Sequence, residues 1–224
     1  MTGIERHDLI YLKESGYEFA MANAHCPLCD ISNIMPEVLR GSSGKAPIPG
    51  IVRTQWRNIS GILDVGYVSD QYTQETRIRI ASSVRNEDIR MVVHPQEVFL
   101  MRDAWPPEKR MLLGELENAA EKYRCRLGLF GSIALQTVTG RTYLRQASDV
   151  DLVLYQEKRT DLAGFYQEIL RLQEIYHTRC DVEVVLENIG NAKLFELLSD
   201  STTVLCKSLY GPSVYKKATN KKIF

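Results

Sequence analysis

The segment from Leu127 to Tyr155, LGLFGSIALQTVTGRTYLRQASDVDLVLY, constrains the fold of this 224-residue chain more than any other. Its first apolar run, LGLFG, predicts a buried strand, and Ser132 begins a predicted helix that Gly140 ends. The run DVDLVLY predicts a second strand. The segment therefore predicts a sheet in which a strand, a tight turn, a helix and a further strand follow one another.

Asp149 and Asp151 lie two residues apart in the second of these strands, so their side chains point to the same face. Two like charges on one face of an otherwise apolar strand repel each other and are costly to desolvate. A divalent cation would neutralise them, and a phosphorylated ligand would complete the coordination shell of that cation. The pair therefore favours metal ligation, with Mg²⁺ as the expected ion, over a solvated strand end.

Gly131 and Ser132 stand where the first strand meets the helix. Such a turn gathers backbone N–H groups and the positive end of the helix at one point, which suits an anion. Glycine lets the backbone approach a ligand closely, although a Gly-Ser turn by itself is also a common helix cap. Together with the aspartate pair, the turn predicts a metal-dependent site for phosphoryl or nucleotidyl transfer. The chain has neither a Walker-type nor a dinucleotide-type glycine motif.

A two-metal site would need a third carboxylate, and the predicted strand CDVEVVL supplies two candidates. Asp181 and Glu183 share one face of that strand. The residues themselves do not decide between the two, and at least one of them is expected to be an ordinary solvated strand residue.

We expect an α+β protein with two domains, residues 1–104 and 105–224. The first part predicts a small mixed α/β domain, with strands at 51–56, 59–68 and 75–84 after the loop GSSGKAPIPG. The second part predicts a mixed sheet flanked by helices. Its elements include the amphipathic segment TDLAGFYQEILRLQEIYH, a short helix in NAKLFELLSD and a last strand in TTVLCKSLYG.

Composition bears on partners and location. The 28 Lys and Arg residues balance the 28 Asp and Glu residues, which gives no global reason to expect binding to nucleic acid or membranes. The absence of a long apolar segment predicts a cytoplasmic protein. The five cysteines are scattered, and only Cys26 and Cys29 form a pair. Incidental thiols are favoured there over half of a zinc site or a redox dithiol.

These residues resemble the nucleotidyltransferase superfamily, in which a Gly-Ser turn is followed by Asp-x-Asp on the next strand. The sixteen residues between Ser132 and Asp149 exceed the usual interval of that superfamily. The longer form is similar to the phosphoribosyl-dephospho-CoA transferase family of malonate decarboxylase, also called holo-acyl-carrier-protein synthase. The positions that fit the pattern of this family are Ser132, Gln136, Thr139, Gly140, Tyr143, Ser148, Asp149, Asp151 and Leu152. HDLIYL and HPQEV, in the first hundred residues, also resemble elements of the family.

The resemblance implies a nucleotidyltransferase-like catalytic domain and a defined reaction. The donor would be 2′-(5″-triphosphoribosyl)-3′-dephospho-CoA, and the acceptor a serine hydroxyl on the acyl-carrier subunit of malonate decarboxylase. Attack at the α-phosphorus would release pyrophosphate and leave the prosthetic group attached through a phosphodiester. The alternatives are an ATP-dependent nucleotidyltransferase that acts on a small molecule or protein, and a non-catalytic module that docks on a carrier protein.

Within this reaction Asp149 and Asp151 are expected to hold Mg²⁺, and one of the other two carboxylates completes the metal shell or acts as general base. The expected catalytic residues are Asp149, Asp151, Asp181 and Glu183. The residues expected to bind the donor phosphates are Gly131, Ser132, Tyr143, Arg145 and Ser148. For the insertion, which also contains Arg141, a solvated loop is an equal alternative. Candidates for a basic face toward an acidic carrier are Arg77, Arg79, Arg85, Arg90 and the tail YKKATNKK, with a solvated surface favoured.

Overall fold

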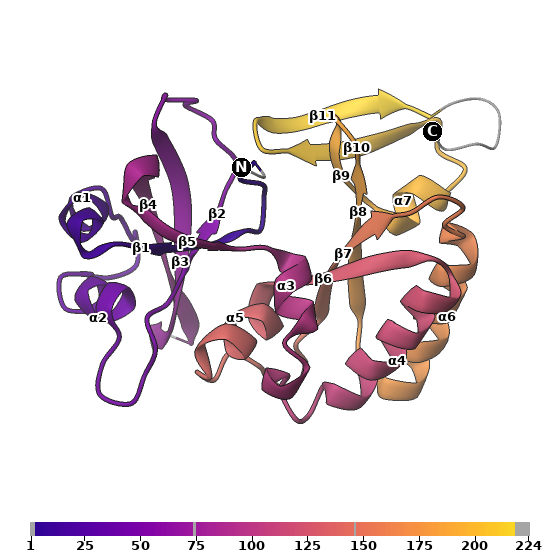
Figure 1. Cartoon of the computed structure of the whole chain (residues 1–224), viewed down its shortest axis with the longest axis horizontal. Coiled ribbons are helices and arrows are strands. Elements are labelled where there is room, and N and C mark those ends of the chain that lie inside the picture. The colour runs from indigo at the N-terminus through magenta and orange to yellow at the C-terminus, as the bar shows by residue number, and fades with distance from the viewer. Residues whose placement is uncertain (1–2, 74, 146, 218–224) are drawn as a thin grey trace.

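The computed structural model describes residues 3–73, 75–145 and 147–217, and it contains two β-sheets that lie side by side (Figure 1). The first sheet has five strands in the order β4-β3-β2-β1-β5, and all of its pairings are antiparallel. The second sheet has six strands in the order β11-β10-β9-β8-β7-β6. Its only parallel pairing joins β7 and β8. The predicted α+β class is confirmed.

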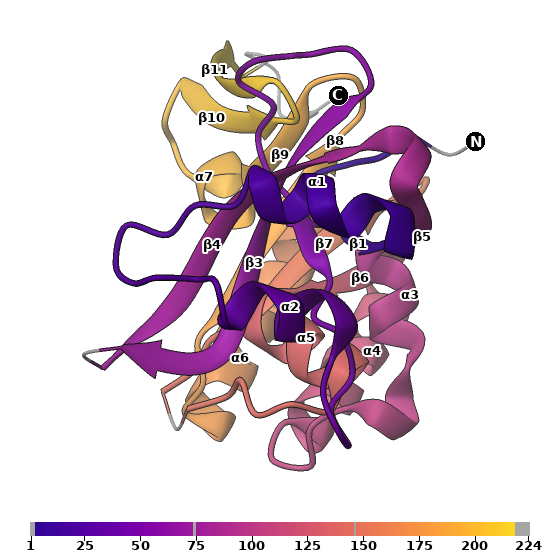
Figure 2. The same ribbon diagram turned by 90° about the vertical axis from the view of Figure 1, so that its left-hand side faces the viewer.

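The strands of the first sheet are β1 (Leu9–Leu12), β2 (Gly50–Val52), β3 (Ile62–Thr73), β4 (Thr76–Arg85) and β5 (Ile89–Val93). Helices α1 (Tyr17–Ala22) and α2 (Ile34–Arg40) cover one face of this sheet (Figure 2). Short 3₁₀ turns occur at Glu14–Gly16 and Asn86–Asp88. The three strands predicted between residues 51 and 84 are confirmed, although β2 is only three residues long. The two helices were not predicted.

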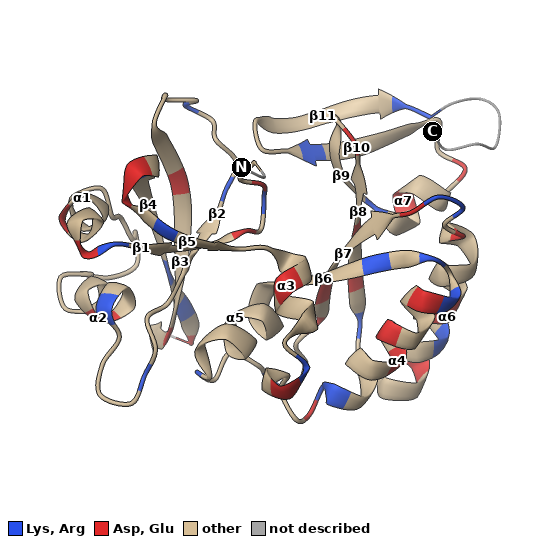
Figure 3. Cartoon of the chain, viewed as in Figure 1, with Lys and Arg blue, Asp and Glu red and all other residues tan. Residues whose placement is uncertain are grey.

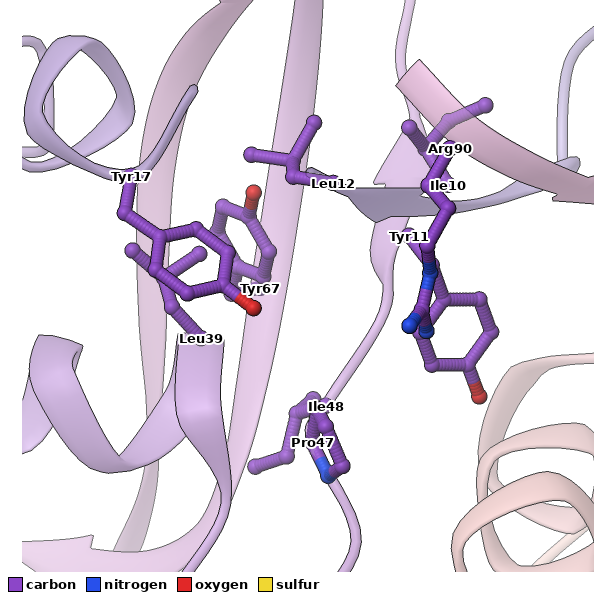
Figure 4. A pocket seen from close by; sticks show the side chains of 9 residues that line it. All are labelled: Ile10, Tyr11, Leu12, Tyr17, Leu39, Pro47, Ile48, Tyr67 and Arg90. Carbon is purple, nitrogen blue, oxygen red and sulfur yellow. The ribbon is translucent and has the colours of Figure 1, made fainter. Parts of the chain in front are cut away.

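The face under α1 and α2 is filled by alternate residues of the long strands, as the period of two requires. Leu63, Val65 and Tyr67 of β3 point into this core. A small pocket lies in it, and the rings of Tyr17 and Tyr67 stand close together along its wall (Figure 4). Burial raises the pKa of Tyr67, and its hydroxyl has no hydrogen-bond partner among the described residues. The pocket belongs to the core of the first sheet itself.

The strands of the second sheet are β6 (Cys125–Phe130), β7 (Val150–Gln156), β8 (Cys180–Leu186), β9 (Gly190–Lys193), β10 (Thr203–Ser208) and β11 (Gly211–Lys216). The accompanying helices are α3 (Pro95–Leu100), α4 (Arg110–Lys122), α5 (Gly131–Thr139), α6 (Leu162–Tyr176) and α7 (Leu194–Leu198), with a 3₁₀ turn at Arg102–Ala104. Helices α4 and α6 cover the face that is turned away from the first sheet, whereas α3 and α5 lie between the sheets (Figure 1).

The end of the chain differs from the prediction. The segment NAKLFELLSD was expected to form a single short helix, but its first residues belong to β9 and only Leu194–Leu198 is helical. Strand β11 was not predicted. Residues Gly190–Lys193 carry no apolar alternation, and they become a strand because β8 and β10 pair with them on both sides.

Helix α3 joins the two halves of the chain. A Cβ atom on Gly128 of β6 would lie 2.7 Å from the Cβ of Pro95, so this glycine allows α3 to pack directly on the strand. Val98 and Phe99 of α3 belong to the core cluster of the second sheet. Helix α3 thus packs with the second sheet, although it comes before residue 105, where the second domain was predicted to begin. The predicted boundary between residues 104 and 105 remains a prediction. Across the described ranges, no helix has the length and apolar character needed to cross a bilayer.

Candidate active site

Four carboxylates lie on one face of the second sheet. In the parallel pairing of β7 and β8, Asp151 is level with Asp181, and Val153 is level with Glu183. Level residues of neighbouring strands point to the same face, and Asp149 joins them because it lies two residues before Asp151. The four residues predicted as catalytic carboxylates therefore share one side of the sheet.

The predicted Gly-Ser turn packs against this carboxylate face. A Cβ atom on Gly131 would overlap Oδ2 of Asp151, and the φ angle of Gly131 is +69°. Both observations require glycine, because it alone lacks the clashing atom and adopts such a φ without strain. Helix α5 begins at this residue, so its positive end, with Ser132 in the first turn, lies beside Asp151. The turn and the carboxylates thus form one site.

The electrostatics of the site show an excess of negative charge. Burial raises the pKa of Asp151 to about 7, with further contributions from the charges of Asp181 and Asp149. The only cation within ion-pair distance of Asp149 is Arg179, at 3.9 Å, within the described part of the chain. A bound cation would relieve the repulsion among these carboxylates.

The carboxylates of the site fit Mg²⁺, but they supply only part of its coordination shell. Carboxylate oxygens are ligands that Mg²⁺ prefers, and Asp149 and Asp151 supply them. Over residues 3–73, 75–145 and 147–217, no three His, Cys, Asp or Glu side chains converge as a full metal site. Mg²⁺ commonly uses one or two carboxylates together with water and substrate phosphates. The donor set is therefore of the kind that binds this ion along with a phosphorylated ligand.

Asp181 is the more accessible of the two candidates for the third carboxylate. Its side chain retains 24% of its exposure, compared with 5% for Glu183. It lies level with Asp151, and Nζ of Lys193 donates a hydrogen bond to its Oδ2 at 2.5 Å. Asp181 therefore faces the aspartate pair and can be reached by a ligand.

Glu183 is instead enclosed by cations and hydrogen-bond donors. Its Oε2 accepts a hydrogen bond from Nε2 of His7 at 3.0 Å, and its Oε1 lies 3.3 Å from Nζ of Lys193. Burial alone would raise the pKa of Glu183, but the hydrogen bond from His7 and the charges of Lys193 and Arg6 outweigh burial and hold it well below its usual range. Glu183 is thus an ionised anchor for the segment that precedes β1.

His7 and Lys193 contact the site but were not among the predicted site residues. The ring of His7 stacks on that of Phe130, with 3.9 Å between ring centroids, directly before Gly131. Its φ angle of +72° is rare outside glycine. Burial lowers the pKa of His7, so the neutral ring donates its Nε2 proton to Glu183. The motif HDLIYL contained a signal for His7, whereas Lys193 lies in the unpredicted strand β9.

Hydrogen bonds to Gln136 of α5 and packing against the first sheet hold the loop between α5 and β7 in place. Oε1 of Gln136 accepts hydrogen bonds from the N–H groups of Tyr143 and Leu144, at 2.9 and 3.0 Å. The Tyr143 side chain is fully buried, and its hydroxyl donates to the carbonyl oxygen of Val68 at 2.8 Å. Tyr143 therefore packs against the first sheet, and its predicted role in phosphate binding remains a prediction.

The other polar residues of the loop have separate environments. Arg141 is buried and pairs with Glu37 of α2 and Asp70 of β3, at 3.1 and 3.0 Å, so it joins the loop to the first sheet and its helix. Arg145 is exposed, and its N–H donates to Oγ of Ser148 at 2.8 Å. Ser148 thus shapes the turn that leads into the carboxylate strand, while the guanidinium of Arg145 is open to solvent.

Two of the candidates for a basic face make contacts within the protein, and the face itself remains a prediction. Arg85 pairs with Asp88 and Glu87, at 3.2 and 3.5 Å, and Arg77 turns toward Tyr143. Basic and acidic residues are interspersed over both halves of the molecule in the view of Figure 3. The end of the basic tail, residues 218–222, lies outside the described residues. Cys26 and Cys29 have their sulfur atoms 3.7 Å apart as free thiols.

Comparison with known proteins gives one consistent family. The profile described as phosphoribosyl-dephospho-CoA transferase MdcG C-terminal domain matches residues 98–218. A phosphoribosyl-dephospho-CoA transferase of Xanthomonas campestris pv. campestris is 29% identical over 102 residues, which cover 46% of this chain and 48% of that protein. The one from Bradyrhizobium diazoefficiens is 23% identical over 136 residues, 58% of each chain. That of Xanthomonas euvesicatoria pv. vesicatoria is 26% identical over 206 residues, 91% of this chain and 90% of that protein.

The extent of these matches differs among the relatives. The chain spans about half the length of the Xanthomonas campestris proteins that it matches, and 58% of the Bradyrhizobium protein. No solved structure matches the chain.

Proposed function

Since the chain belongs to the phosphoribosyl-dephospho-CoA transferase MdcG C-terminal domain family, we propose that it transfers a 2′-(5″-phosphoribosyl)-3′-dephospho-CoA group to a protein serine. The donor is the triphosphoribosyl precursor, 2′-(5″-triphosphoribosyl)-3′-dephospho-CoA. The acceptor is the acyl-carrier subunit of malonate decarboxylase, and pyrophosphate is released. The observation that carries this proposal is the contact of Gly131 with Asp151, which places a helix N-terminus against a carboxylate face.

In this proposal Asp149 and Asp151 hold Mg²⁺, which when bound neutralises the donor phosphates and makes the α-phosphorus more electrophilic. The raised pKa of Asp151 supports this assignment, because burial and the neighbouring charges of Asp181 and Asp149 together outweigh the charge of Lys193. Asp181 is the third carboxylate in preference to Glu183, because Asp181 is the more exposed of the two and Glu183 is enclosed by His7 and Arg6.

The transfer itself is a single displacement. The serine oxygen of the carrier forms a bond to the α-phosphorus as the bond from that phosphorus to the bridging β-oxygen breaks. Pyrophosphate leaves with the bridging oxygen, and Gly131 and Ser132 hold its phosphates at the N-terminus of α5. The serine proton passes to Asp181 as general base and then to solvent. The product is a phosphodiester between the carrier serine and the ribose.

Mass measurement of the carrier protein tests this proposal. Purified protein is incubated with Mg²⁺, the triphosphoribosyl donor and the apo carrier subunit, and we expect the carrier to gain the mass of one phosphoribosyl-dephospho-CoA group. A carrier with its acceptor serine replaced by alanine serves as the control and should gain no mass. A parallel incubation with ATP examines the alternative, because an adenylyl group adds a far smaller mass. An unmodified carrier in the donor incubation, or adenylylation in its place, would overturn the proposal.

A further inference from the structure

Two arginines from different parts of the chain flank one tyrosine. Arg77 of β4 places its Cζ atom 5.1 Å from the ring centroid of Tyr72 in β3, and the Cζ of Arg145 lies 4.6 Å from the same centroid. The Tyr72 hydroxyl accepts a hydrogen bond from Nε of Arg145 at 3.3 Å, and a second one from Arg77. We call this group of three residues the arginine clamp. It brings two positive charges to one aromatic side chain.

The charges of the arginine clamp are not compensated by the described residues. Within those residues, neither Arg77 nor Arg145 has a carboxylate within the 4.0 Å of an ion pair, in contrast to Arg141, which has two. The guanidinium groups bind backbone carbonyls instead, Arg77 that of Tyr143 at 2.7 Å and Arg145 that of Glu75 at 3.2 Å. The Nε atom of Arg77 is buried and has no partner in the described chain. An anion would relieve the repulsion between these two like charges.

The arginine clamp adjoins the proposed active site. The N–H of Arg145 donates to Oγ of Ser148, and the N–H of Ser148 donates to the carbonyl of Arg145 at 2.9 Å. Ser148 is followed directly by Asp149, which shares a face with Asp151. These two hydrogen bonds therefore tie Arg145 to the residue that precedes the aspartate pair.

We propose that the arginine clamp binds a polyphosphate group of the donor, so that the first sheet supplies part of the donor site. This inference rests on the proposed function for the identity of the donor. Paired guanidinium groups suit polyphosphate because each can form two parallel hydrogen bonds to phosphate oxygens. The donor carries two such groups, the triphosphate that is cleaved and the diphosphate of its dephospho-CoA part. Both offer the same chemistry to the clamp.

Calorimetric titration of the full-length protein tests the arginine clamp without requiring catalysis. One arm uses inorganic tripolyphosphate, and the other uses 3′-dephospho-CoA. We expect Arg145→Ala to weaken the binding of at least one of these ligands by about tenfold or more. The ligand that is affected identifies which phosphates the clamp holds. Arg77 also packs on the ring of Tyr143, so its second variant is Arg77→Lys instead of an alanine substitution. Lysine keeps the positive charge but lacks the planar guanidinium that binds phosphate through two parallel hydrogen bonds.

Arg79→Ala is the matched control. Arg79 is an exposed residue of the same strand as Arg77, lies opposite Val68, and its removal changes the net charge equally. Unchanged binding of both ligands in Arg145→Ala and Arg77→Lys would overturn the inference, and so would an equal loss in Arg79→Ala. If the wild-type protein binds these ligands through the arginine clamp but modifies no carrier, the proposed function is overturned and the clamp stands. If the wild-type protein modifies the carrier but Arg145→Ala leaves the KM for the donor unchanged, the clamp is overturned and the proposed function stands.

Discussion

Nε2 of His7 lies 3.0 Å from Oε2 of Glu183, a hydrogen bond that joins residues 176 positions apart in the chain. It connects the segment before β1 to the middle of β8, where Glu183 lies two residues after Asp181 on the same face of the strand. The same histidine ring stacks on Phe130, whose successor is Gly131. The start of the chain thus supports both the carboxylate strand and the turn proposed to bind phosphate.

Replacing this histidine should destabilise the protein. In His7→Ala, Glu183 loses a hydrogen bond to a buried charge and Phe130 loses its stacking partner, so we expect the free energy of unfolding to fall by about 1–3 kcal/mol. Urea denaturation followed by circular dichroism measures the change. His25→Ala, at an exposed histidine, is the control. Equal stability of the two variants would show that the contact with Glu183 contributes nothing.

The two candidates for the third carboxylate should behave oppositely. Asp181→Asn is expected to reduce transfer by about two to three orders of magnitude with little change in stability, because Asp181 faces the proposed site. Glu183→Gln should chiefly lower stability, since it removes a buried counter-charge of Lys193 and the ionised acceptor of the His7 hydrogen bond. Carrier modification rates and urea denaturation of both variants separate the two effects. The reverse pattern would assign the catalytic role to Glu183.

The protein without metal should become less stable as pH rises from about 4 to about 7. The folded pKa of Asp151, about 7, exceeds that of an aspartate in an unfolded chain, so the folded state binds more protons between these values. Its free energy of unfolding therefore decreases with pH over this interval. We expect Asp151→Asn to remove a difference on the order of 2 kcal/mol between pH 5 and pH 8. Denaturation of wild type, this variant and the exposed-site control Asp200→Asn at both pH values would reveal it, and identical pH dependence in all three would refute the assignment.

Gly131 should tolerate no side chain. In Gly131→Ala the new Cβ overlaps Oδ2 of Asp151 at a φ of +69°, so we expect lost transfer activity and a decrease in stability of about 1–2 kcal/mol. Gly114→Ala is the control, because nothing lies within 4 Å of the new atom and the residue is in the interior of α4. Alanine should stabilise that helix by about 0.5–1 kcal/mol. Transfer assays and thermal denaturation report both changes.

The sequence predicted the parts of the fold that depend on local patterns. The run from Cys125 to Gln156 and helix α6 carry clear apolar periodicity, and their elements are confirmed. The level placement of Asp151 and Asp181 could not be predicted, because it depends on which strands are neighbours and in what register. Helices α1 and α2 lie in a segment interrupted by Pro, Cys and Gly, where a periodic signal is weak.

The surroundings of the site were predictable to a smaller extent. Lys193 was missed because the strand GNAK has no apolar alternation and is defined by its neighbours. Arg141 was expected in a loop beside the donor, but its side chain is buried against Glu37 of α2 and Asp70 of β3. These contacts link residues 104 and 71 positions apart, and no local pattern encodes them.

The buried Arg141 makes the long insertion dependent on the first sheet and its helix α2. Its guanidinium pairs with Glu37, 104 residues earlier in the chain, and also binds the carbonyl oxygen of Ala46 at 2.9 Å. In the intact protein, replacing both Glu37 and Asp70 by alanine would leave this buried guanidinium without its counter-charges, a loss of about 3–5 kcal/mol. The placement of the long insertion beside the carboxylate strand therefore depends on residues that precede it by 71 to 104 positions.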